Sequence, residues 1–178
     1  MGYKIFVFIV IICVVVGYII LNNKLNKAMI KVDEASSDID VALAKRYDVL
    51  TKMIEVVKSY TKHEEKIIFE VIKLRNNMSM DEKDNENKKM DACLNKINIV
   101  VENYPKLKSN QNYKLLQQSI LDVEEHLQAA RRLYNSNVSI YNQMLATFPT
   151  DLISKSRGMV KRDFFEADIL SKDNVGID

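Results

Sequence analysis

The stretch that decides the fold runs from residue 22 to residue 60 and reads NNKLNKAMIKVDEASSDIDVALAKRYDVLTKMIEVVKSY. It contains neither Gly nor Pro, so nothing in it interrupts a helix. Mostly apolar positions recur in steps of four and three residues, which places them along one helical stripe. The pattern predicts a helix of nearly forty residues, of the kind found in bundles and coiled coils. The stripe consists of Leu25, Met29, Val32, Ser36, Ile39, Leu43, Tyr47, Leu50, Ile54 and Val57.

An apolar segment precedes this helix. Ile5 to Leu21 reads IFVFIVIICVVVGYIIL, without a charge, and its 17 residues reach the lower limit for crossing a bilayer as a helix. A cleaved signal peptide is the alternative, but the sequence that follows Leu21 lacks a small-x-small cleavage site. We therefore expect a retained single-pass anchor at 5–21, in the cell membrane, after a short extracytoplasmic stub at 1–4.

The lysines that flank the anchor predict its orientation. Lys4 precedes the segment, whereas Lys24, Lys27 and Lys31 follow it. Positively charged residues near a span are retained in the cytoplasm, so the bias favours a cytoplasmic C-terminal part. A bundle that faces the cell envelope is the alternative.

Three further helices are expected. The capping-box pattern at 61–64 predicts a second helix over 61–77, with one helix continuing through Thr61 as the alternative. Residues 79–89 are almost wholly polar and are interpreted as a solvated turn with a frayed first helical turn. A third helix is expected from Met90 until Pro105 stops it, and a fourth from the caps at 110–112 to Phe148.

Together these helices predict an all-α protein, with an N-terminal transmembrane helix and an antiparallel up-and-down four-helix bundle over 22–149. The second and third helices are short, so apolar positions of the long helices near the membrane would lack cover. Either the segment at 150–166, with a short helical turn closed by Gly158, folds back on them, or a second copy does. Residues 167–178 are expected to form a flexible tail. The uncovered positions are Leu25, Met29, Val32, Tyr141 and Leu145.

Composition excludes several other classes of protein. Four Gly and two Pro in 178 residues leave little material for the turns of a β-sandwich or barrel. A net charge of +2, from 26 basic and 24 acidic residues, lacks the basic excess typical of a nucleic-acid binder, so no nucleic-acid partner is expected.

Three stretches resemble the LemA family of bacterial membrane-anchored helical proteins. They are IDVALAKRYDVLTKMIEVVKSYTKHE at 39–64, NYPKLKSNQNYKLLQ at 103–117, and ARRLYNSNVSIYNQMLATFP at 130–149 followed by FFE at 164–166. The resemblance implies a membrane-anchored four-helix up-and-down bundle. It implies location and fold more than mechanism, because the activity of the family is poorly defined. The chain departs from the family pattern at Thr51, Ser59 and the residues around Gly158.

We find no pattern that predicts a catalytic, cofactor or metal site. A di-metal carboxylate site needs Glu-x-x-His, but Tyr60 and Val123 stand three residues before the two histidines. Asp122 and His126 share a helix face, where such a pair is usually a surface hydrogen bond. Cys13 and Cys93 fit neither a disulfide framework nor a metal site.

Polar residues on or beside the stripes are the candidate interaction residues. One interpretation is structural, with hydroxyl and amide groups satisfied inside the bundle; the other is a recognition face for a partner. They are Arg46, Tyr47, Asp48, Arg131, Tyr134, Asn135, Tyr141 and Asn142. Phe164 and Phe165, close to a basic run at 155–162, are expected either to pack on the bundle or to enter the membrane interface.

These observations favour a non-catalytic interaction or scaffold module, not an enzyme, that binds a protein partner or a second copy at the lipid bilayer. The alternative is a membrane-associated enzyme or its accessory subunit.

Overall fold

The computed structural model describes residues 2–61 and 78–165, and in these residues the chain is helical without any strand. The elements in order are α1 (Gly2–Tyr60), α2 (Met80–Glu102), α3 (Pro105–Lys108), α4 (Gln111–Ala146) and α5 (Thr150–Ser156). The expected all-α class and the N-terminal apolar helix are confirmed. The expected helix at 61–77 and the tail at 167–178 lie outside the described residues, so the four-helix bundle stays a prediction.

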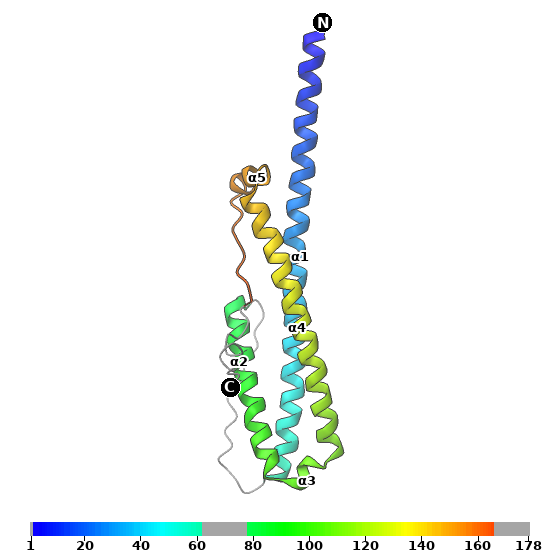
Figure 1. Ribbon diagram of the computed structural model, residues 1–178, viewed down its shortest axis with the longest axis vertical. Helices are drawn as coiled ribbons and strands as arrows, with labels where there is room; N and C mark the ends of the chain where they lie inside the picture. Colours follow the sequence, from blue (N-terminus) through cyan, green and yellow to red (C-terminus); the bar gives the residue numbers. More distant parts are fainter. Residues whose placement is uncertain (1, 62–77, 166–178) are drawn as a thin grey trace, which may run out of the picture. The chain divides into compact units, whose positions relative to one another are not determined.

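The anchor segment and the helix after it form one helix. α1 continues for 59 residues without interruption, and it ends at Tyr60, as expected (Figure 1). Its first part is long and apolar enough to cross a membrane, with a mean hydropathy of 3.0 over 18 residues and none of that window buried. Phe6, Ile12 and Tyr18, for example, are about half exposed or more.

α2 begins ten residues earlier than the sequence predicted. Ser79 caps it: its hydroxyl accepts from the amide of Glu82, while the Glu82 carboxylate accepts from the amide of Ser79. The interpretation of 79–89 as a solvated turn was therefore wrong. Lys83, Glu86 and Asn87 are all buried. These polar residues therefore extend the buried stripe of α2 that continues at Met90.

The other helix ends differ less from expectation. α2 ends at Glu102, and Pro105 opens the short α3, where a missing amide hydrogen costs nothing. Asn110 caps α4 by accepting from the amide of Tyr113, as expected. α4 ends at Ala146, so Phe148 lies outside it and is 80% exposed. Gly158 ends the turn after α5 with a φ of 63°, in the left-handed region that glycine tolerates best.

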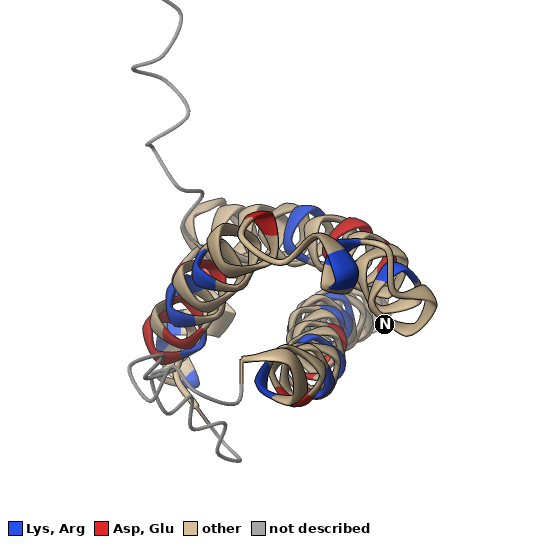
Figure 2. Ribbon diagram, turned by 90° about the horizontal axis from the view of Figure 1, so that it is seen from below, with Lys and Arg blue, Asp and Glu red and all other residues tan. Residues whose placement is uncertain are grey.

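The chain divides into two compact units, each built from parts of α1 and α4. The anchor unit comprises residues 1–36 and 133–163, and the charged unit comprises residues 37–132 and 164–178. The charged unit has an apolar core in which Leu50, Met53 and Val57 of α1 are buried with Met90 and Ile97 of α2. Basic and acidic residues follow one another along the described helices, as the near-neutral net charge implies (Figure 2).

Candidate functional site

A buried cluster of charges occupies the charged unit. Arg46 of α1 is only 1% exposed, although the sequence placed Tyr47 on the stripe at this level. Its guanidinium donates to the amide oxygen of Asn87 and pairs with Asp91, both of α2. It also pairs with Glu124 of α4 at 2.9 Å. Arg46 thus joins three helices through one planar group, a geometry that suits its fork of donors.

A second buried cation lies in the same unit. Lys83 of α2 is 4% exposed and pairs with Asp40 of α1 at 2.8 Å. An unpaired buried ammonium would be very unfavourable, so this pair explains why a lysine can occupy the inner face of α2. Asn87, which bonds Arg46, also donates to the Asp91 carboxylate at 3.3 Å.

Arg131 of α4 is held against an aromatic ring. Its guanidinium carbon lies 4.5 Å from the centre of the Phe165 ring, a cation–π contact, and Phe165 is 2% exposed. Burial lowers the pKa of Arg131, and the nearby Glu124 carboxylate opposes that shift. Among the described residues, two buried nitrogens of this guanidinium, Nε and Nη2, have no hydrogen-bond partner. Phe165 is therefore buried in the charged unit, against Arg131.

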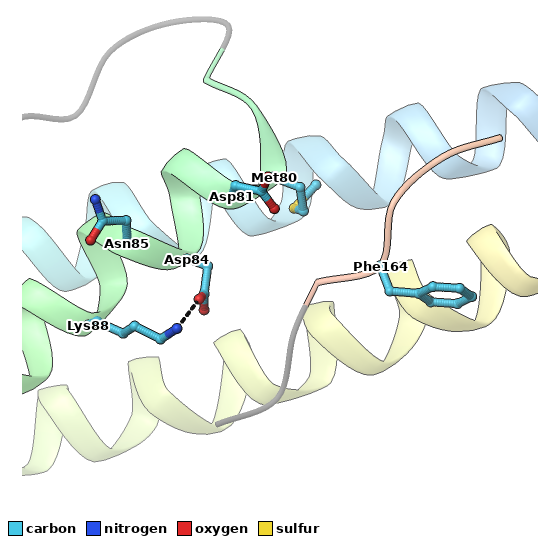
Figure 3. Close-up of a pocket in the computed structure, with 6 residues that line it drawn as sticks. All are labelled: Met80, Asp81, Asp84, Asn85, Lys88 and Phe164. Atoms are coloured by element: carbon cyan, nitrogen blue, oxygen red, sulfur yellow. Dashed lines mark ion pairs between the residues drawn. The ribbon is translucent and has the colours of Figure 1, made fainter. Parts of the chain in front are cut away.

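Phe164 points elsewhere. It is 48% exposed and lines a pocket of about 410 Å³ with Met80, Asp81, Asp84, Asn85 and Lys88 of α2 (Figure 3). The carboxylate of Asp84 pairs with Lys88 at 2.6 Å. In residues 2–61 and 78–165, no group of three or more His, Cys, Asp or Glu side chains is arranged to hold a metal ion.

In the anchor unit, the predicted tyrosines and asparagine hold the segment after α5. We call residues 157–163 the strap. The hydroxyl of Tyr134 donates to the carbonyl of Asp163 at 2.9 Å, and that of Tyr141 donates to the carbonyl of Val160 at 3.2 Å. Asn142 exchanges two hydrogen bonds, of 2.8 and 2.9 Å, with the backbone of Arg162. Burial raises the pKa of both tyrosines.

The strap also reaches α1. Arg157 donates to the side-chain oxygens of Asn22 and Asn26 at 2.8 and 2.7 Å, and Arg162 pairs with Asp33 at 3.3 Å. Leu25, Val32, Tyr141 and Leu145, the positions expected to need cover, are buried, and Met29 is half-buried. The chain's own strap therefore contacts α1 within the anchor unit.

The candidate residues therefore fall into three groups. Arg46 is buried in the charged unit and Arg131 is half-buried there. Tyr134, Tyr141 and Asn142 hold the strap, with Asn135 half-buried on the same helix. Tyr47 and Asp48 are exposed. Sequence reasoning missed Asn87, Asp91 and Glu124; the spacing of Asn87 and Asp91 by four residues, on the stripe of Met90, was the available signal.

A family model and one relative point to the same family, and other relatives match over part of the chain. The model of the LemA family matches residues 35–178. Protein LemA of Metamycoplasma hominis is 24% identical over 184 residues, which cover 98% of this chain and 84% of that protein. Magnetosome protein MamQ of Magnetospirillum gryphiswaldense is 26% identical over 73 residues, 41% of this chain and 27% of the relative. Magnetosome protein MamQ 2 of Paramagnetospirillum magneticum is 27% identical over 74 residues, 42% of this chain and 27% of the relative.

Proposed function

Because the chain belongs to the LemA family, we propose that it is a membrane-anchored helical module that binds a protein partner and performs no catalysis itself. The apolar start of α1 and the family both support membrane anchorage. The partner and the absence of catalysis are the proposed part.

The observation that carries this proposal is the continuity of α1. Its first part exposes a full apolar surface of the length a bilayer requires, and the same helix goes on to supply Leu50, Met53 and Val57 to the core of the charged unit. The helix that anchors the chain thus also builds the folded part, which tethers any binding surface of that part to the membrane. The buried arginine and lysine of that part are engaged with carboxylates of the same unit.

Exposed residues of the charged unit offer the partner surface. Tyr47 is 36% exposed and lies beside the exposed Asp48, and Phe164 is 48% exposed next to the pocket of α2. Tyrosine and other aromatic residues are frequent anchors in protein interfaces, since they bury large areas with few rotatable bonds.

Photocrosslinking in native membranes tests the proposal. A photoreactive phenylalanine derivative replaces Tyr47 or Phe164 in the full chain, and Tyr60 serves as the matched control because its exposure, 37%, equals that of Tyr47 within a percent. We expect one discrete adduct from position 47 or 164. An adduct of two copies of this chain would identify the partner as the chain itself. No adduct, or the same adducts at position 60, would contradict the proposal.

We further propose that the part after the anchor faces the cytoplasm, on the bias of Lys24, Lys27 and Lys31 over Lys4. An epitope placed after Asp178 and challenged with protease tests this. Protection in intact cells, lost when the membrane is opened, is expected. Cleavage while a cytoplasmic marker survives would place the unit in the envelope instead.

A further inference from the structure

A groove between α1 and α4 lies in the anchor unit, just beyond the apolar segment. On α1 the lining lysines, Lys24, Lys27 and Lys31, are spaced by three and four residues and so share one face. On α4 the lining residues Asn137, Ile140 and Met144 likewise share a face. The groove has a volume of about 270 Å³, and Ile140 is half exposed in it.

The two helices run antiparallel here, which orients the groove. Asn137 donates to the carbonyl of Lys31 at 3.0 Å, whereas Arg157, farther along the chain, reaches back to Asn22. Met144 therefore lies toward the Lys24 end, which faces the apolar segment. Its side chain supplies apolar surface at the membrane end, and Ile140 supplies apolar surface one turn farther from the membrane.

Lys24 and Lys27 lie at or close to the height of the headgroup layer, and Lys31 lies beyond it. At about 1.5 Å per residue, Lys24 and Lys27 lie about 4.5 and 9 Å along the axis beyond Leu21, and Lys31 about 15 Å. The polar layer of a bilayer leaflet is about 5–8 Å deep. Side chains of a helix tilt toward its N-terminus, which here is the membrane, so the ammonium groups of Lys24 and Lys27 can lean back toward lipid phosphates, and that of Lys31 toward the outer part of a headgroup.

The charges and surroundings of the groove favour an anionic ligand. No described carboxylate pairs with Lys24, Lys27 or Lys31. The same end of the unit also exposes apolar side chains, since Leu152 of α5 and Val160 of the strap are 59% and 71% exposed. Arg157 joins this end of the strap to α1 by its hydrogen bond to Asn22, the first residue after the apolar segment.

We propose that this groove is a binding site for one anionic phospholipid. Lys24 and Lys27 contact the phosphate, Lys31 contacts the rest of the polar headgroup, and Met144, at the level of Lys24, contacts the start of an acyl chain, with Ile140 lining the groove beside the phosphate. Clustered basic residues beside a membrane span attract anionic lipid headgroups, and a phosphate fits between ammonium groups. The site rests on the membrane anchorage but on neither the protein partner nor the orientation.

The test uses the full chain in detergent micelles, titrated with short-chain phosphatidylglycerol or phosphatidylcholine and followed by native mass spectrometry. We expect one tightly retained phosphatidylglycerol molecule per chain and weaker binding of phosphatidylcholine. The triple variant Lys24→Gln, Lys27→Gln, Lys31→Gln should lower the phosphatidylglycerol affinity roughly 10- to 100-fold. The matched control, Lys45→Gln, Lys52→Gln, Lys58→Gln, removes three exposed charges from the same helix and should leave it unchanged.

Three results would overturn the site. The first is a triple variant that keeps its preference for phosphatidylglycerol, and the second is an equal loss in the control, which would indicate general charge attraction. In the third, glycerol phosphate would bind as tightly as the lipid, and the ligand would be a soluble anion. The double variant Ile140→Ser, Met144→Ser should weaken the binding of both lipids. If the triple variant still sediments with membranes, the anchor stands whatever the lipid result.

Discussion

The anchor unit and the charged unit hold their polar side chains in opposite ways. In the charged unit, Arg46 and Lys83 are buried as ions, and each faces carboxylates from another helix. In the anchor unit, the neutral groups of Tyr134, Tyr141 and Asn142 bond the backbone of the strap. Buried ions are costly unless every partner is present, whereas a neutral hydrogen bond can be lost at modest cost. The two units should therefore respond very differently to the loss of one polar group.

The largest effect is expected where a buried ion loses both of its carboxylate partners. The double variant Asp91→Asn, Glu124→Gln leaves Arg46 charged at 1% exposure. We expect a loss of about 3–5 kcal/mol in the free energy of unfolding. Arg46→Met should cost less, because it removes the buried charge, and the two carboxylates, 40% and 36% exposed, can bind water. Chemical unfolding of the full chain in detergent measures both, and an equal cost for the two variants would contradict this asymmetry.

The next effect separates two adjacent aromatic residues. Phe165→Ala removes a buried ring and its contact with Arg131, for an expected loss of about 3 kcal/mol. Phe164→Ala, the matched control, changes a side chain that is 48% exposed and should cost much less than Phe165→Ala. Thermal unfolding compares them. Equal effects would mean that Phe165 does not pack as described.

A smaller and local effect is expected in the anchor unit. Tyr134→Phe with Tyr141→Phe removes two hydroxyl hydrogen bonds to the strap, worth about 1–2 kcal/mol together. Hydrogen exchange at the strap amides should rise while exchange in the core of the charged unit stays unchanged. Tyr47→Phe, at an exposed position, is the control. Faster exchange throughout the chain would show that the strap is not a separate local element.

The same tyrosines predict a response to alkaline pH. Burial raises the pKa of Tyr134 and Tyr141, so the folded state favours the neutral phenols. Their contribution to stability is complete below the ordinary tyrosine pKa of about 10 and is lost as the pH rises through the raised values. Exchange of the strap amides in this alkaline range should therefore exceed that expected from base catalysis alone. The double Phe variant should lack this excess.

The smallest effect tests the corrected start of α2. Ser79→Ala removes the hydroxyl that accepts from the Glu82 amide and should cost about 1 kcal/mol. Ser136→Ala, at an exposed position inside α4, lacks this capping role and serves as the control. Amide exchange in the first turn of α2 reports the change. An unaffected first turn would contradict the cap.

The sequence by itself determined the helical class, the apolar segment at 5–21, the end of α1 at Tyr60 and the cap at Asn110. These features depend on local chemistry: periodicity, uninterrupted helix formers and capping side chains. The same local signals at Ser79 and Glu82 were present, but the polar stretch after them carried no apolar stripe and was interpreted as a turn.

Only the tertiary structure decided which polar residues lie inside. Arg46, and not Tyr47, lies on the inner face of α1, and Lys83 and Asn87 lie on that of α2. These residues can be buried because residues far away in sequence supply their hydrogen-bond and ion-pair partners. A polar residue is buried only when such partners are positioned, and no periodicity in one helix records where another helix places its carboxylates. For the same reason, Phe165 and Phe164 could not be distinguished before their surroundings were known.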